Sequence, residues 1–289
     1  MTMLLGRRSA RNLYDTVAEG SAAAVIRSYS SSFGLASRLL AEPVRTHVCN
    51  IYALVRIADE IVDNPDPSLG RAARETMLTW LHEDLRQALR TGYSGNLVVH
   101  AAARTAIECG IGDEIIDPFF ASMAMDLEQT VHTEESFARY VYGSAEVVGL
   151  MCLRAFLHAE RRGDYDRLAP GAQRLGAAFQ KINFLRDLAE DHDTLHRRYF
   201  PGLDVDRFGD DDRDRILDDI QADLDAAAAV IPALPRSSRR AVRAAHVTFE
   251  ELATRLRATP ASEIRRTRVR VPAAVKLRLV AGTIYGDRS

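Results

Sequence analysis

The sequence Gln180-Lys181-Ile182-Asn183-Phe184-Leu185-Arg186-Asp187-Leu188-Ala189-Glu190-Asp191 decides the fold of this chain. The stretch has no proline and no β-branched run, and strong helix formers stand at most positions, which predicts a helix. Apolar residues recur along one face of that helix, namely Leu175, Ala178, Phe179, Ile182, Leu185 and Leu188. The residues Gln180, Asn183, Asp187 and Asp191 share a second, polar face.

The polar face places Asp187 and Asp191 one helical turn apart. Two like charges at this spacing destabilise an isolated helix by roughly 0.2–0.5 kcal/mol, so we expect positive charge to lie over them. A single pair of this kind also fits a solvated polar face. A second copy far upstream favours a functional interpretation, because one face of residues 51–63 carries Tyr52, Arg56, Asp59 and Asp63.

The two acidic helices each have an apolar side opposite their carboxylates. In the upstream helix that side consists of Ile51, Leu54, Val55, Ala58 and Val62. If the acidic faces meet across a helical bundle, four carboxylates converge on one cavity. Hard divalent cations take oxygen ligands, and Mg²⁺ prefers few carboxylates together with substrate phosphate oxygens. The pattern therefore predicts a cation site at the meeting point of the two helices.

Length and composition restrict the protein class. The chain has 289 residues, 47% hydrophobic content and a formal net charge of −2, which gives no argument for nucleic-acid binding. The three cysteines, Cys49, Cys109 and Cys152, are far apart and suit a reduced compartment rather than a zinc site. No signal peptide or spanning helix is predicted. We expect a cytoplasmic protein, at most peripheral to a membrane.

Period-3.6 segments follow one another along the chain, and no strand series interrupts them, so the predicted fold is all-α, with one domain spanning 1–289. Helices are predicted over about 13–28, 33–40, from Pro43 to 63, 69–90, 96–109, 113–130, 134–159, 170–193 and 236–258. Ten aspartates between Asp204 and Asp225 predict a solvated surface that leads into a helix. The basic tail from Arg265 to Arg278 suits acidic surface, anionic lipid or phosphate groups.

Small residues interrupt the predicted helix 134–159 at Gly143, Ser144 and Gly149. A glycine inside a helix destabilises it by about 1 kcal/mol relative to alanine. Two interpretations stay open: close packing against a neighbouring helix, or room for a long apolar ligand along one wall.

A diphosphate held through Mg²⁺ suits the acidic pairs and their polar neighbours Arg56, Arg186, Gln180 and Asn183. Arginines bind phosphate oxygens through two hydrogen bonds at once. The metal would neutralise a departing diphosphate, so that an allylic C–O bond can break. The carbocation left behind needs a dry pocket, and the aromatic faces of Tyr52, Tyr140 or Phe33 are candidates for its stabilisation.

These segments together resemble the squalene/phytoene synthases, the head-to-head prenyl transferases, and look closest to the bacterial phytoene synthases. The resemblance rests on residues 29–33 (YSSSF), 51–63 (IYALVRIADEIVD), 140–151 (YVYGSAEVVGLM), 180–191 and 199–201 (YFP). Each Asp-x-x-x-Asp pattern is weak alone, but the two in this order and with these flanks are specific.

The resemblance implies an isoprenoid-synthase helical bundle around a central cavity. It implies Mg²⁺, or Mn²⁺ in its place, with metal-site residues Asp59, Asp63, Asn183, Asp187 and Asp191 and with Glu60 and Glu190 nearby. Tyr52 and Arg56 would join the four aspartates in catalysis. The implied substrate-binding residues are Ser30, Ser32, Phe33, Arg56, Tyr140, Gly149, Gln180, Asn183, Arg186, Tyr199 and Arg268.

Three positions depart from the usual family pattern. Glu60 stands where many members have aspartate, Ser31 where a basic residue is common, and His196 where glycine is common. The first change keeps the charge, whereas Ser31 puts one diphosphate contact in doubt and His196 the shape of its loop.

The implied reaction joins two prenyl diphosphates head to head through a cyclopropylcarbinyl diphosphate. Our leading hypothesis is condensation of two geranylgeranyl diphosphates to phytoene, because the segments resemble phytoene synthases and the small Ser37 leaves space for a longer chain. Squalene or dehydrosqualene formation from farnesyl diphosphate is the alternative, and only squalene formation needs NADPH. Peripheral membrane contact would suit release of the product.

Two further classes stay open at this stage. A non-catalytic relative, such as an assembly factor for respiratory complexes, has no need of the four aspartates that this chain retains. A terpene cyclase or a chain-elongating prenyl transferase usually carries a DDxxD-type motif, which the sequence lacks at both acidic pairs.

Overall fold

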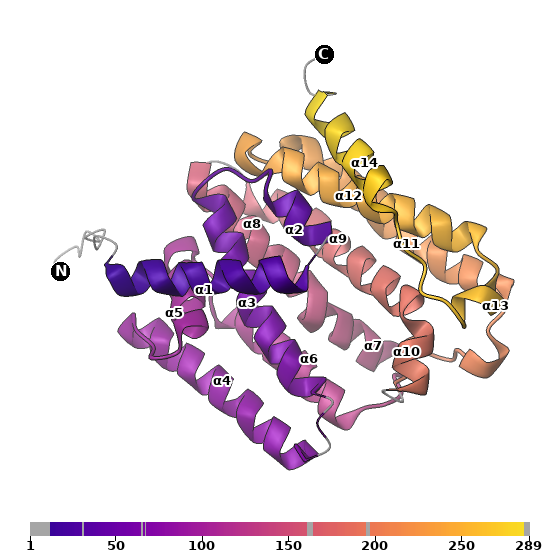
Figure 1. Ribbon diagram of the computed structural model, residues 1–289, viewed down its shortest axis with the longest axis horizontal. Coiled ribbons are helices and arrows are strands. Elements are labelled where there is room, and N and C mark those ends of the chain that lie inside the picture. Colours follow the sequence, from indigo (N-terminus) through magenta and orange to yellow (C-terminus); the bar gives the residue numbers. More distant parts are fainter. Residues whose placement is uncertain are drawn as a thin grey trace.

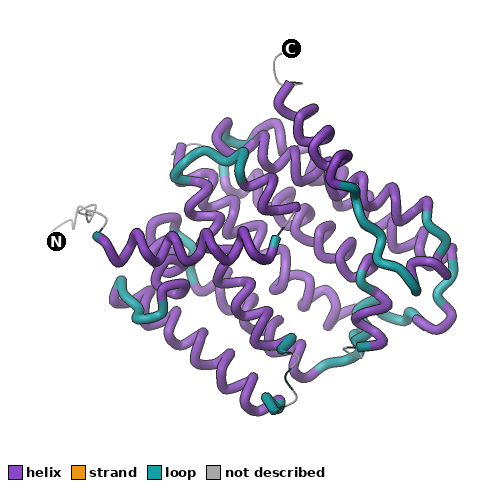
Figure 2. Tube along the Cα trace, in the orientation of Figure 1, coloured by secondary structure: helices purple, strands orange, loops and turns teal. Residues whose placement is uncertain are grey.

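A computed structural model describes residues 12–30, 32–64, 66, 68–160, 164–194 and 197–285. Helices joined by loops make up the described chain, as Figure 2 shows, and within these ranges no strand forms beyond a β-bridge between Val131 and Arg198. The predicted all-α class is therefore confirmed.

The helices pack as a bundle (Figure 1). Their bounds are α1 (Leu13–Tyr29), α2 (Ser32–Ser37), α3 (Val44–Val62), α4 (Arg71–Thr91), α5 (Leu97–Cys109), α6 (Asp113–Glu128), α7 (Glu134–Val141), α8 (Val147–Glu160), α9 (Tyr165–Arg186), α10 (Leu188–Asp193), α11 (Asp210–Val230), α12 (Arg236–Ala258), α13 (Ala261–Ile264) and α14 (Ala273–Tyr285). A π-helical turn, η1 (Tyr142–Glu146), joins α7 to α8, and two 3₁₀ turns, η2 (Val205–Arg207) and η3 (Ile231–Ala233), flank α11.

The predicted helix 170–193 is two helices, broken at Asp187 between α9 and α10. Asp187 leaves helical geometry with φ −99° and ψ 10°. Carboxylates are unfavourable at the C-terminal end of a helix, where the macrodipole is negative, and favourable in a first turn. The break places Glu190 and Asp191 in the first turn of α10, which accounts for the difference from the single predicted helix.

The predicted helix 134–159 contains the π turn η1, which crosses α6 and α9 closely. A β-carbon on Gly143 would overlap the backbone of Pro118 in α6, and one on Gly149 would overlap the backbone of Ala172 in α9. The structure thus supports close packing for both glycines. This region, Glu134–His158, is long and apolar enough to cross a membrane, but 56% of its most apolar window is buried inside the protein, which is typical of a core helix.

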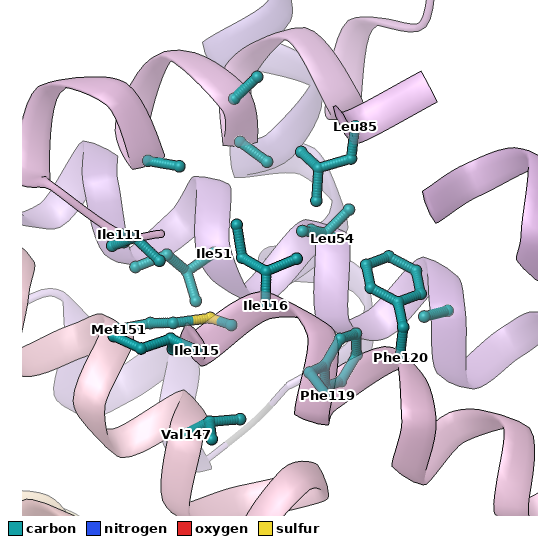
Figure 3. Close-up of a cluster of buried hydrophobic side chains, with 14 of the residues drawn as sticks. Ile51, Leu54, Leu85, Ile111, Ile115, Ile116, Phe119, Phe120, Val147 and Met151 are labelled. Atoms are coloured by element: carbon teal, nitrogen blue, oxygen red, sulfur yellow. The ribbon is translucent and has the colours of Figure 1, made fainter. Parts of the chain in front are cut away.

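The apolar side of α3 enters a core shared with α4, α5, α6 and α8. Figure 3 shows Ile116 and Phe119 of α6 gathered with Leu54 of α3 and Leu85 of α4. Burial of each such side chain contributes about 1.5–3 kcal/mol to stability. The core therefore holds the acidic end of α3 on a rigid support.

The aspartates of 204–225 form a solvated surface as predicted, with one exception. Asp223 of α11 is buried at 2% exposure. Lys181 Nζ of α9 lies 2.8 Å from its carboxylate, and Arg174 Nη1 lies 2.9 Å from it. Asp223 lies on the face of α11 that packs on α9, so it is buried, and the two cations compensate its charge.

Candidate active site

A cavity of about 560 Å³ lies between α3, α8, α9, α11 and α12. Along α9 its lining changes from Leu168 and Leu175 to Gln180, Asn183 and Arg186, at 1.5 Å per residue. The lining order is reversed along η1 and α8, from Ser144 to Phe156, so these two elements run antiparallel to α9. The cavity therefore has one apolar end and one polar end. Seven predicted substrate-binding residues line it: Ser30, Arg56, Gly149, Gln180, Asn183, Arg186 and Arg268. Tyr52, which was predicted to act in catalysis, lines it as well.

The acidic end of α3 lies beside the polar end of the cavity. Arg56, which lines the cavity, places Nη1 2.6 Å from Oδ2 of Asp59 and also bonds to Glu60. Burial raises the pKa of Asp59 to about 6, and the neighbouring charge of Asp63 adds to the rise. Asp59 therefore favours a positive partner, which Arg56 supplies.

Arginines also contact the second acidic pair, Asp187 and Asp191. Asp187 accepts a hydrogen bond from Arg186 Nε at 2.8 Å and lies 2.8 Å from Arg268 Nε. Burial raises the pKa of Asp191 to about 7, and Asp187 contributes by like-charge repulsion. The arginines at this end of the cavity thus neutralise carboxylates on α3 and at the α9–α10 junction.

The two acidic pairs face each other across Arg197. Its Nη1 lies 2.6 Å from Oδ1 of Asp63, while its backbone N–H donates to the carbonyl of Asp191 at 2.9 Å. Asp63 is also close enough to Asp191 to raise the pKa of that carboxyl. Segments 124 residues or more apart in sequence therefore meet, as the spacing patterns predicted.

A fifth carboxylate, Asp126 of α6, lies behind Arg197 and was not predicted from the sequence. Tyr140 donates to it at 2.8 Å, Tyr199 donates to it at 3.3 Å, and Arg197 Nη1 lies 3.8 Å away. Burial raises the pKa of Asp126 to about 7 although Arg197 opposes the rise. The sequence pattern that could have indicated Asp126 is its position as the only carboxylate in the otherwise apolar run 123–127.

Tyr140 and Tyr199, two predicted substrate-binding residues, do not line the cavity. Both side chains are buried, and Tyr199 stacks on Phe184 with ring centroids 3.9 Å apart. Their hydroxyls turn to Asp126 because a buried phenol needs a hydrogen-bond partner. Ser32 and Phe33 begin α2, but their side chains lie outside the described residues, as do Ser31 and His196.

Comparison with known proteins agrees with this arrangement. A model of the squalene/phytoene synthase family matches residues 26–274. The chain belongs to the squalene/phytoene synthase family. The 15-cis-phytoene synthase of Enterobacter agglomerans is 29% identical over 251 residues, which cover 77% of this chain and 80% of that protein.

Solved structures share the fold of this family member at low sequence identity. A dehydrosqualene synthase crystallised with a ligand matches with a TM-score of 0.77 and 18% identity, covering 95% of this chain and 98% of that one. A squalene synthase from Alicyclobacillus acidocaldarius matches with a TM-score of 0.73 and 20% identity, covering 86% and 96%. The isoprenoid-synthase helical fold is thus confirmed, and the family indicates a prenyltransferase.

The donor set of this family member suits a divalent cation that arrives with a diphosphate. Among the described residues no three histidine, cysteine, aspartate or glutamate side chains gather as a ready metal cluster. Mg²⁺ in diphosphate sites needs one or two carboxylates, completed by phosphate oxygens and water. Two half-buried carboxylate pairs at the mouth of a cavity meet that requirement.

Proposed function

We propose that the protein condenses two molecules of geranylgeranyl diphosphate head to head to phytoene, through prephytoene diphosphate and with release of two diphosphates. The observation that carries the proposal is the meeting of two acidic pairs beside the polar end of the cavity, where the lining residues Arg56 and Arg268 pair with Asp59 and Asp187. The likeness to a 15-cis-phytoene synthase supports the choice of product.

The polar end is suited to diphosphate binding. Arg56, Arg186 and Arg268 line it with guanidinium groups, which bind phosphate oxygens through paired hydrogen bonds. Gln180 and Asn183 add amide groups on the same face of α9. We assign Mg²⁺ to Asp59, Asp63, Asn183, Asp187 and Asp191; when bound, it neutralises charge on the leaving diphosphate.

The apolar cavity serves the hydrocarbon chains. In the first half-reaction, the C–O bond of one substrate breaks, its electron pair leaves with diphosphate, and the second substrate's double bond attacks the cation. Loss of a proton then closes the cyclopropane ring. We expect the lining to exclude water from the cation, and Phe179 and Phe249, whose ring centroids lie 3.8 Å apart, are the aromatic residues of this lining that could stabilise it.

In the second half-reaction, the cyclopropylcarbinyl diphosphate ionises at the same polar end. The cation rearranges and loses a proton to give phytoene, so no reductant is consumed. Formation of squalene from farnesyl diphosphate differs, because the final cation takes a hydride from NADPH. The need for NADPH therefore separates that alternative from phytoene and dehydrosqualene formation.

Mass spectrometry of the hydrocarbons formed from C15 and C20 prenyl diphosphates with Mg²⁺ tests the proposal. We expect a C40 hydrocarbon from geranylgeranyl diphosphate without NADPH. Exclusive use of the C15 substrate would favour the alternative, and a cyclised or lengthened single chain would overturn head-to-head condensation. Asp59→Asn should abolish product formation, whereas Asp218→Asn, an exposed aspartate of α11, should not.

A further inference from the structure

Arg197 is a buried cation between the two acidic pairs. Its side chain is 8% exposed, and its Nη1 lies 2.6 Å from Oδ1 of Asp63. Its backbone N–H donates a hydrogen bond to the carbonyl of Asp191 at 2.9 Å. The next N–H, that of Arg198, donates to the carbonyl of Thr130 at 2.7 Å. The backbone therefore holds this guanidinium group beside both acidic pairs.

A cation fixed at this position competes with a divalent metal for the same carboxylate. The proposed function assigns Asp63 to Mg²⁺, and in the structure Asp63 neutralises Arg197. A metal ion that binds this carboxylate removes the closest partner of a buried guanidinium group. A buried charge without a partner is strongly destabilising. Arg197 therefore needs a second acidic partner when the metal site is filled.

Asp126 of α6 is that second partner. Its Oδ1 lies 3.8 Å from Nη1 of Arg197, and its backbone carbonyl accepts a hydrogen bond from Nη2 at 3.3 Å. The Tyr199 hydroxyl lies between the two side chains, because it accepts from Nη1 at 3.3 Å and donates to Oδ1 of Asp126 at 3.3 Å. Burial acts to lower the pKa of Arg197, but the charge of Asp126 is the first of several that raise it overall.

Asp126 is itself held firmly and lies outside the reaction cavity. Its side chain is 4% exposed, and Tyr140 donates a hydrogen bond to its Oδ2 at 2.8 Å. The described residues that line the reaction cavity include neither Asp126 nor Arg197. We therefore expect both side chains to act on a bound ligand through the acidic pairs rather than by direct contact.

We propose that Asp126 is a positioning residue that shares Arg197 with Asp63, so that Asp63 can exchange this cation for a divalent metal when a diphosphate binds. Without a charged partner behind it, Arg197 would pair fully with Asp63 and compete with the metal. The inference rests on the proposed function for the nature of the ligand, a diphosphate bound with Mg²⁺. It is independent of the length of the hydrocarbon chain.

Calorimetric binding of inorganic pyrophosphate at a series of Mg²⁺ concentrations tests the proposal. The substitution Asp126→Asn removes the charge, and the comparison is made at about pH 8, above the Asp126 pKa of about 7. Loss of a residue that supports a metal ligand typically lowers metal affinity about 10- to 100-fold, so the Mg²⁺ concentration for half-maximal binding should rise by that factor. The matched control on the same helix, Asp117→Asn, pairs with Arg86 and His82 of α4 and should leave that concentration unchanged.

A second substitution distinguishes positioning from general damage to the fold. The double variant Asp126→Asn, Arg197→Gln lacks the competing cation, so it should need less Mg²⁺ to bind pyrophosphate than the Asp126→Asn variant does. A packing defect at Asp126 would persist or grow when Arg197 is also replaced. Wild-type Mg²⁺ dependence in the Asp126→Asn variant, or a deficit that the second substitution does not reduce, would overturn the proposal.

The same titrations separate failure of this inference from failure of the proposed function. If the wild type binds pyrophosphate with Mg²⁺ and the Asp126→Asn variant binds it equally well, the positioning role is wrong and the proposed function stands. If the variants behave as expected but the product is a single cyclised or lengthened chain, the proposed function is wrong and the positioning role stands. A wild type that binds no pyrophosphate in the presence of Mg²⁺ would overturn both.

Discussion

The buried carboxylate Asp126 makes the stability of the fold depend on pH in a specific direction. Its side chain is 4% exposed, and it accepts hydrogen bonds from Tyr140 and Tyr199. Burial raises its pKa from the ordinary 3.8 to about 7, with Arg197 and the bond from Tyr140 acting against the rise and Asp63 and Asp59 adding to it. The substitution Asp126→Asn removes this ionisation while nearly preserving the shape of the side chain.

The direction of this pH dependence follows from comparing the unfolded with the folded protein. As pH rises from about 4 to about 7, the unfolded chain loses the Asp126 proton first, while the folded protein still holds it. Ionisation of this group therefore lowers the free energy of unfolding over that interval. About three pKa units at about 1.4 kcal/mol each set an upper bound of about 4 kcal/mol. The asparagine side chain cannot ionise. The free energy of unfolding of the variant should therefore rise relative to that of the wild type, by up to about 4 kcal/mol between about pH 4 and about pH 7.

Urea unfolding measures this difference in the free energy of unfolding. It is followed by far-ultraviolet circular dichroism and repeated from about pH 4 to about pH 8. The matched control is Asp117→Asn on the same helix. Burial acts to raise the pKa of Asp117, but hydrogen bonds from Arg86 and His82 lower it overall, so its contribution is lost only below about pH 4. Parallel curves for wild type and the Asp126→Asn variant across the whole interval would refute the reasoning.

Three other substitutions test packing and chemistry. Lys181→Met removes the 2.8 Å partner of buried Asp223 and should destabilise the fold by about 3 kcal/mol in urea unfolding; unchanged stability would contradict the buried pair. Gly176→Ala places a β-carbon against the backbone of the π turn η1 and should destabilise the fold by about 1–3 kcal/mol, whereas Gly20→Ala, with open space, should not destabilise it. Asp187→Ala should abolish hydrocarbon formation with an unchanged circular dichroism spectrum, and an active variant would remove this carboxylate from the chemistry.

The sequence predicted those features that depend on local periodicity. The acidic faces of Asp59 and Asp63 and of Asp187 and Asp191 follow from spacings of four residues, which any helix converts into one face. Their meeting required two apolar stripes on helices that pack against one common core. For this reason the polar end of the cavity was predictable before any three-dimensional information.

The features that the sequence did not predict depend on tertiary packing. Tyr140 was predicted at the cavity, yet its hydroxyl bonds to Asp126, a partner that no pattern on either helix indicates. Arg197 lies in a loop without periodicity, so its bridging position between Asp63 and Asp191 depends on how the chain returns after α10. The break at Asp187 reflects the electrostatics of helix ends, which a periodicity analysis does not weigh.

The central claim is that two distant acidic pairs act on one ligand across Arg197. A double-mutant cycle of Asp63→Asn and Asp191→Asn tests it most directly, with calorimetric binding of inorganic pyrophosphate in the presence of Mg²⁺ as the readout. Residues that share one ligand couple by about 0.5–3 kcal/mol, and we expect a coupling energy in that range. Strictly additive effects of the two substitutions would show that the pairs act separately and would contradict the account.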